Sequence, residues 1–86
     1  MERPTRIKLL YFAGVSDRLG TREEELDLPV GVERVADLAR FLVTARPALD
    51  GVLASVRFAV GDEFAEPERR LAPGDVVALL PPVSGG

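Results

Sequence analysis

The sequence contains no cysteine, no histidine and no tryptophan. The lack of cysteine excludes disulfides and thiolate nucleophiles, and the lack of both cysteine and histidine excludes zinc fingers and most transition-metal sites. Histidine is also the side chain that most often changes its charge near neutral pH, so the usual general acid or base is missing. We therefore expect a domain that binds no metal and no resident cofactor and supplies little catalytic chemistry of its own.

Long apolar segments and an excess of positive charge are also missing. No apolar stretch approaches the roughly 20 residues that span a bilayer, and residues 1–6 have no apolar run of signal-peptide length. The formal net charge of −3 gives no general attraction to nucleic acid or to an anionic membrane. The sequence therefore predicts a cytoplasmic protein whose partners are other proteins, with no nucleic-acid partner and no membrane partner.

The chain does contain enough apolar material for one domain. Of its 86 residues, 47% are hydrophobic and 29% are charged, which is typical of globular proteins. At this length, folding buries roughly 60–65% of the surface that the unfolded chain exposes. We expect one domain with a small core.

Two apolar runs favour strands in the interior of a sheet. Residues 7–13 place Ile7, Leu9 and Tyr11 on one face of a strand, and Leu10 and Phe12 on the other. Residues 76–80 form a short continuous apolar run. Both patterns are typical of strands that are covered on both faces.

The segments that follow the first strand are weaker signals. Residues 14–20 favour a brief helix with Ser16 as a possible cap and Gly20 as its end. Residues 23–28 favour an edge strand, because their outward carboxylates would hinder pairing with another chain. The three adjacent glutamates at 23–25 could also be interpreted as a cation site. They lack the alternating oxygen ligands of a calcium loop, so a solvated edge is the preferred interpretation.

The main helix is predicted over residues 33–45. Val35, Leu38 and Leu42 recur at the spacing of one helical face, with charged residues on the other side. Phe41 lies beside this apolar stripe, and Pro47 ends the helix.

The rest of the domain is predicted to be strands and turns. Residues 56–60 alternate as a strand, Gly61 and Asp62 form a hairpin turn, and a short strand around Phe64 ends by Pro67. A second turn, in residues 71–75, precedes the last strand. If the first and last strands are neighbours, they run parallel, and the helix crosses one face. The predicted fold class is therefore α+β, a ubiquitin-like β-grasp with a mixed sheet of about five strands, over residues 1–80.

Residues 81–86 follow the last predicted strand and form a tail. Pro81 and Pro82 fix φ and remove two backbone donors, so the strand cannot continue. Six extended residues reach about 20 Å. Gly85 and Gly86 have no side chains, so the tip could pass through a narrow channel to an active site in another protein. The alternative interpretation is a frayed terminus without a role.

The tail and three other segments resemble a known family. Residues 80–86, LPPVSGG, look like the C-terminus of the small subunit of molybdopterin synthase, the MoaD-type sulfur carrier. Residues 7–13, 35–38 and 73–81 are also similar to that family, so the resemblance covers nearly the whole chain. One departure is Val-Gly-Asp-Glu at residues 60–63, where many relatives have an asparagine-containing turn.

The resemblance implies a sulfur-donor subunit of a heteromeric sulfurtransferase that is not itself catalytic. An E1-like, MoeB-type enzyme adenylates the carboxylate of Gly86, and sulfur then displaces AMP to leave a thiocarboxylate. AMP and sulfur are thus carried only transiently, on Gly86. The tail enters the active site of a MoaE-type large subunit, in an expected heterotetramer, and sulfur passes to cyclic pyranopterin monophosphate in molybdenum cofactor biosynthesis. The residues expected to insert are Pro81, Pro82, Val83, Ser84 and Gly85.

A carrier also needs a docking surface. We expect Phe12, Phe64 and Leu80 to form an apolar patch that docks each protein partner, although Phe12 and Leu80 could instead belong to the core. Other functions fit the same pattern: a sulfur carrier for thiazole, cysteine or tRNA thiolation, a ubiquitin-like modifier joined to lysines, or a non-covalent adaptor.

Overall fold

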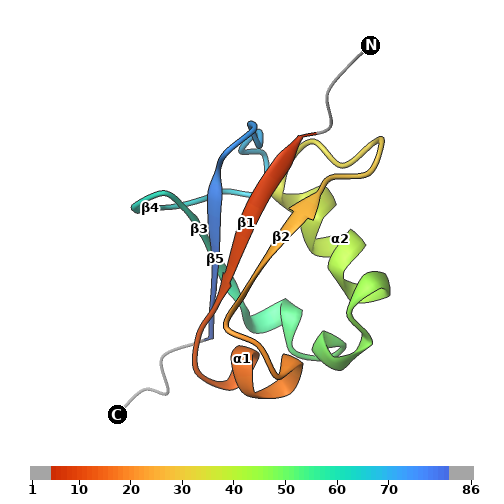
Figure 1. The fold of residues 1–86 in the computed structure, drawn as a ribbon, viewed down its shortest axis with the longest axis vertical. Coiled ribbons are helices and arrows are strands. Elements are labelled where there is room, and N and C mark those ends of the chain that lie inside the picture. Colours follow the sequence, from red (N-terminus) through yellow and green to blue (C-terminus); the bar gives the residue numbers. More distant parts are fainter. Residues whose placement is uncertain (1–4, 82–86) are drawn as a thin grey trace.

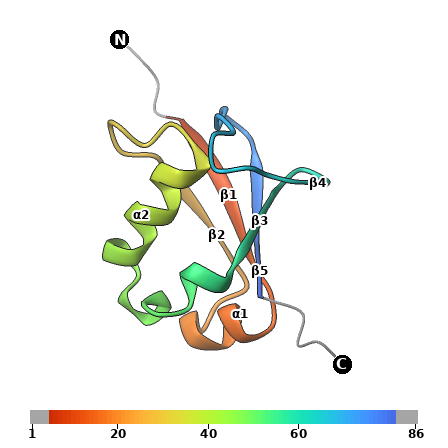
Figure 2. The same ribbon diagram turned by 180° about the vertical axis from the view of Figure 1, so that it is seen from behind.

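The computed structural model describes residues 5–81, and in it the longer of two α-helices crosses one face of a five-stranded mixed sheet (Figures 1 and 2). The predictions for Pro82, Val83, Ser84, Gly85 and Gly86 lie outside the described residues. The elements are, in chain order, β1 Arg6–Tyr11, α1 Gly14–Leu19, β2 Glu23–Asp27, α2 Val35–Ala45, the 3₁₀ turns η1 Pro47–Leu49 and η2 Leu53–Ser55, β3 Arg57–Val60, β4 Glu63–Phe64 and β5 Val76–Leu80.

The strand order β2-β1-β5-β3-β4 is that of the predicted β-grasp. β1 and β5 are parallel neighbours, with Leu9 opposite Val77 and Tyr11 opposite Leu79. All other pairs are antiparallel. Parallel neighbours need a crossover connection, and here that connection includes α2. The predicted parallel pairing of the first and last strands is therefore confirmed.

The sheet is covered on one face only, so the prediction of strands covered on both faces is wrong. On the core face, Ile7, Leu9 and Leu79 pack with Leu38 and Leu42 of α2, all nearly inaccessible to solvent. The opposite face, which we call the open face, has no second layer within residues 5–81. On β1 and β5 its apolar residues are Leu10, Ala78 and Leu80, which are only half-buried, and Val76, which is exposed. An apolar run on both faces does not reveal whether the second face is covered by this chain.

α2 begins two residues later than predicted because Asp37 caps it. The Asp37 carboxylate accepts hydrogen bonds from the backbone N–H groups of Glu33 and Arg34, 3.1 and 3.0 Å away. These hydrogen bonds lower the pKa of Asp37, since they stabilise its charged form. Phe41 packs against the core from the side, as predicted.

Two further segments differ from the sequence prediction. The loop before β3 contains two 3₁₀ turns, which bury Leu49 and Leu53 in the core, and the first of them packs against α1 and α2. Ser16 is not a cap but lies inside α1, where its Oγ–H donates to the carbonyl of Ala13, 2.8 Å away. The N-cap position is held by Ala13, at φ 49° and ψ −126°.

Ala13 is strained, because a Cβ-bearing residue rarely adopts a positive φ. Its carbonyl is fixed by Ser16 and by the Asp17 N–H, and Val15, which follows, is fully buried. We expect Ala13→Gly to raise the free energy of unfolding by about 1 kcal/mol, since glycine adopts this conformation without the steric cost. Urea denaturation measures the change.

The matched control is Ala48→Gly, at an exposed position without a positive φ. There the added freedom of the unfolded chain should lower the free energy of unfolding by about 0.5–1 kcal/mol. If both glycine variants were equally destabilised, strain at Ala13 would be ruled out.

Candidate functional site

The site predicted from the sequence begins where β5 ends. β5 lies between β1 and β3, and Leu80, its last residue, is paired with Arg57 of β3. Pro81 follows, half-buried and outside any strand. The described part of the chain therefore ends beside the interior strands of the sheet, at the end that also carries α1 (Figure 1).

Apolar side chains form a row across the open face. The register places Leu10 opposite Ala78, Ala78 opposite Ala59, and Ala59 opposite Phe64. Paired residues in neighbouring strands project to the same face, so these four side chains run from β1 to β4. Leu80 lies on the same face of β5 as Ala78, two residues further along the chain and therefore closer to the tail.

The three predicted docking residues lie at or near this row. Phe12 is 45% exposed and follows β1 at the end of the sheet where β5 also ends. Phe64 is 61% exposed, and the Arg57 guanidinium stacks over its ring at 4.2 Å. Leu80 is half-buried, and its strand, β5, lies between β1, which Phe12 follows, and β4, which carries Phe64. Phe12 and Leu80 are therefore not part of the core, and we define Leu10, Phe12, Phe64, Ala78 and Leu80 as the apolar patch.

Sequence reasoning missed Leu10 and Arg57 as members of this surface. The prediction of a strand covered on both faces placed Leu10 in the interior, and the strand predicted at residues 56–60 gave Arg57 no role. The signal was present in the spacing, because Leu10 and Leu80 fall on the face opposite the core once both strands are placed side by side. The partner of Arg57 could not be found without the hairpin register.

A network of three side chains lies on the core face of the sheet, near the end where β1 and β5 finish. The buried Tyr11 donates its hydroxyl proton to Glu24 Oε2, and Arg46 holds the same carboxylate through Nε, at 3.1 Å, and a terminal guanidinium nitrogen. The network joins β1, β2 and the end of α2. Burial and the hydrogen bond to Glu24 raise the pKa of Tyr11. Hydrogen bonding to Arg46 lowers the pKa of Glu24 despite its partial burial.

Glu24 makes the stability of the fold depend on pH. Its pKa is lower in the folded chain than in the unfolded chain, so its contribution is complete above the unfolded pKa and is lost as the pH falls through the folded value. We expect Glu24→Gln to lower the free energy of unfolding by about 1 kcal/mol at neutral pH, because a charge-assisted hydrogen bond is lost. The difference from the wild type should shrink towards about pH 3. Urea denaturation at both pH values tests this, and a difference independent of pH would contradict it.

The remaining acidic side chains of β2 do not surround a common point, as the ligands of a bound cation would. β2 is an edge strand, as predicted. Glu23 forms an ion pair with Lys8 at 3.0 Å, while Arg6 bonds Asp27 at 2.8 Å and lies 3.9 Å from Glu25. These exposed pairs run along the open face beside the apolar patch. Within residues 5–81 no cluster of His, Cys, Asp and Glu side chains could hold a metal ion, and no helix is long and apolar enough to cross a bilayer.

Comparison with known proteins shows one family over nearly the whole chain. The model of the ThiS family matches residues 9–86. The molybdopterin synthase sulfur carrier subunit of Chlamydomonas reinhardtii is 39% identical over 83 residues, which cover 94% of this chain and 99% of the relative. The crystal structure of SAMP1 from Haloferax volcanii is 34% identical with a TM-score of 0.76, and the match covers 94% of this chain and 99% of that one.

A complex of subunits 1 and 2 of the molybdopterin-converting factor from Helicobacter pylori contains a chain of the same fold. It is 22% identical, with a TM-score of 0.70, and the match covers 94% of this chain and 99% of that one. At this identity the likeness concerns the fold alone.

Proposed function

Because the chain belongs to the ThiS family and to the sulfur carrier subunits of molybdopterin synthase, we propose that it carries sulfur on Gly86. The observation that carries the proposal is the 39% identity to a sulfur carrier subunit over a match that covers 94% of the chain. The match to the family model extends to residue 86 and so includes the Gly-Gly tail. The domain between residues 5 and 81 supplies an anchor for that tail and a docking surface for the partner proteins.

The proposed chemistry takes place on the terminal carboxylate. The carboxylate attacks the α-phosphorus of ATP in an E1-like, MoeB-type enzyme, and pyrophosphate leaves. Hydrosulfide, supplied by a donor system, then attacks the acyl carbon and AMP leaves with the C–O bonding pair. The sulfur loses its proton to solvent, so that a thiocarboxylate remains on Gly86. Activation is needed because a free carboxylate has no good leaving group, whereas the mixed anhydride with AMP has one.

In the second half of the cycle, the tail delivers sulfur to a MoaE-type large subunit. The name of the Chlamydomonas relative, a subunit of molybdopterin synthase, supports this partner. Residues 81–86 would enter the active site of the large subunit, and the thiocarboxylate sulfur would pass to cyclic pyranopterin monophosphate. The catalytic acids and bases belong to the partners, since this chain has no histidine or cysteine.

The apolar patch is the proposed docking surface for both partners. It lies on the open face and reaches the end of the sheet from which the tail leaves, so a partner that covers it is well placed to receive residues 81–86. Exposed aromatic side chains are the common anchors of such interfaces.

We expect Phe12→Asp to weaken binding of the large subunit by at least about tenfold. The substitution removes an apolar anchor that the interface would bury, and it forces a carboxylate to lose its hydration there. Isothermal titration calorimetry measures the affinity. Val30→Asp, at a fully exposed position in the loop between β2 and α2, is the control and should leave binding unchanged. Equal affinities of the two variants would exclude Phe12 from the interface.

The direct test of the proposal is the intact mass of the protein. After incubation with ATP, the activating enzyme and a sulfur source, we expect a mass gain equal to the exchange of one oxygen for one sulfur. Fragmentation should place the change on Gly86, and omission of ATP should prevent it. An unchanged mass under conditions that charge a known carrier would reject the function.

A second candidate function is supported by the likeness to SAMP1, a small archaeal modifier protein. In that case Gly86 forms isopeptide bonds with lysines of other proteins. Immunoblots of cell extract would show covalent adducts that persist in denaturant and disappear when Gly85 and Gly86 are deleted. A sulfur carrier without modifier activity gives no such adducts.

A further inference from the structure

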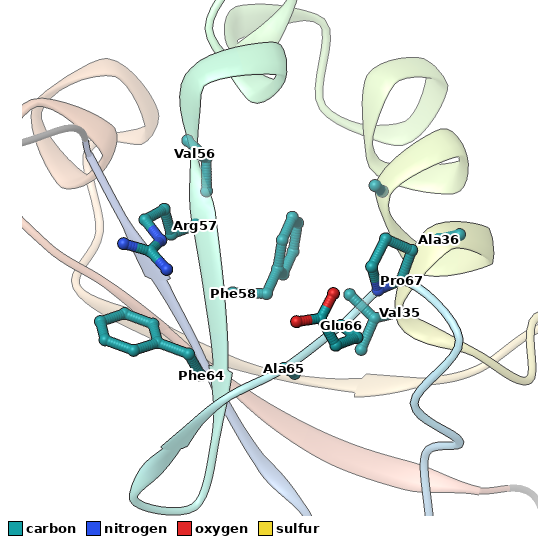
Figure 3. A pocket seen from close by; sticks show the side chains of 10 residues that line it. Val35, Ala36, Val56, Arg57, Phe58, Phe64, Ala65, Glu66 and Pro67 are labelled. Atoms are coloured by element: carbon teal, nitrogen blue, oxygen red, sulfur yellow. The ribbon is translucent and has the colours of Figure 1, made fainter.

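A groove of about 470 Å³ lies at the edge of the sheet opposite β2, between the start of α2 and the beginning of β3 (Figure 3). Its walls are mainly apolar: Val35, Ala36 and Ala39 come from α2, and Val56 and Phe58 from the β3 side. Apart from Phe64, which lies at its margin, it shares no residue with the apolar patch. The proposed sulfur carrier function gives this groove no role.

The groove borders a strand edge that is only partly covered. β4 pairs with β3 at Ala59 and Val60 only. The Ala65 N–H still donates to the Phe58 carbonyl, 2.8 Å away, but the chain then turns towards α2, where the Pro67 carbonyl accepts the Ala36 N–H at 3.0 Å. Within residues 5–81, the first half of β3 has a strand neighbour only on the β5 side. On the α2 side the Phe58 carbonyl is taken by Ala65, and in this part of the chain the Phe58 N–H and the Val56 carbonyl are left for an added strand. An edge of this kind is a template for an added strand.

One negative charge faces the groove. Figure 3 shows the carboxylate of Glu66 directed towards the Phe58 side chain, between β3 and α2. Among residues 5–81, no side chain forms a hydrogen bond or ion pair with it. Arg57 also lines the groove, but its guanidinium is stacked on the Phe64 ring and forms no ion pair with Glu66. A cationic side chain in the groove would therefore find a carboxylate that has no competing partner in the described part of the chain.

We propose that this groove binds an extended segment of a partner protein, which adds to the free edge of β3 and places a lysine or arginine side chain against Glu66. The backbone of the segment would pair with β3, and alternate side chains would point into the groove, over Phe58 and Ala39. The tail of this protein is a poor occupant, because residues 81–86 contain two prolines, two glycines and no positive charge.

A peptide titration tests the proposal on the intact protein. The probe is the synthetic peptide GSVTKSG with blocked ends, in which valine and lysine project from the same side of an extended chain. Amide chemical shifts of the ¹⁵N-labelled protein are followed during the titration. We expect shifts concentrated in residues 35–39 and 56–67. Absence of saturable shifts there, or shifts concentrated on β2 instead, would overturn the proposal.

A charge reversal tests the role of Glu66. We expect Glu66→Lys to weaken binding of the lysine peptide about fivefold, and to favour instead a peptide with glutamate in place of lysine. Glu68→Lys, an exposed position outside the groove with the same change in net charge, is the matched control and should keep the wild-type preference. Equal responses of the two variants would show that only net charge matters and would overturn the proposed contact.

A steric block tests the groove itself. Ala36→Arg, at the groove wall, should abolish the peptide-induced shifts, whereas Thr44→Arg on the exposed surface of α2 should not. Retained binding in Ala36→Arg, with a native spectrum, would contradict the proposal. Deletion of Gly86 should leave peptide binding unchanged, so failure of the groove proposal and failure of the sulfur carrier function are distinguishable.

Discussion

Deletion of Gly86 is expected to reduce sulfur transfer by at least about 100-fold while leaving the domain folded. The deletion retracts the terminal carboxylate by about 3.5 Å, the length of one extended residue, and a misplacement of about 1 Å can already cost a factor of about 100 at a reacting centre. Within residues 5–81 the last residue of the core is Leu79, so circular dichroism should be unchanged. Dithiolene formation with the purified large subunit and activating enzyme measures the loss.

Two observations separate this effect from a loss of docking. The truncated protein should still bind the large subunit, because the apolar patch is intact. Val83→Ala, which keeps the length and the terminal residue of the tail, should retain most of the activity. If the truncated protein supported dithiolene formation at the wild-type rate, the carrier function would be untenable.

Leu79→Ala is expected to lower the free energy of unfolding by about 2–5 kcal/mol. The Leu79 side chain is fully buried on the core face of β5, so its removal leaves a cavity in the centre of a small core. Domains of this size are commonly stable by only about 5–15 kcal/mol, so the loss is a large part of the total. Urea denaturation followed by circular dichroism measures the difference.

Leu80→Ala is the matched control, because it removes the same atoms from the next residue of the same strand. Leu80 is half-buried on the open face, where no second layer formed by residues 5–81 packs, so the change should cost less than about 1.5 kcal/mol. Its larger effect should be on binding of the large subunit. Equal destabilisation by the two substitutions would contradict the one-sided packing of the sheet.

Much of the fold could be predicted from local patterns. The alternation in residues 7–11 and the spacing of Val35, Leu38 and Leu42 identified the central strand and the main helix, because both depend on periodic burial. Gly61 and Gly74 marked turns correctly, since both adopt a positive φ. The Gly-Gly tail was predicted from its unusual composition and stays a prediction, because the described residues end before it.

Features that depend on contacts between distant segments could not be predicted in the same way. The apolar run at residues 76–80 has the same sequence pattern whether its second face is covered by the same chain or by a partner protein. The sequence therefore predicted a covered face where the structure has the open face. The Tyr11, Glu24 and Arg46 network joins three elements and leaves no local signal. Ala13 was missed because glycine, not alanine, is the usual residue at its positive φ.

The position of β5 between a parallel and an antiparallel neighbour has a mechanical consequence. Hydrogen bonds on both sides tie the strand that leads into the tail to β1 and β3. A force applied along β5 would load these bonds in shear, all together, whereas a strand at the edge of the sheet could be separated one bond at a time. Such a force would therefore be spread over the middle of the sheet.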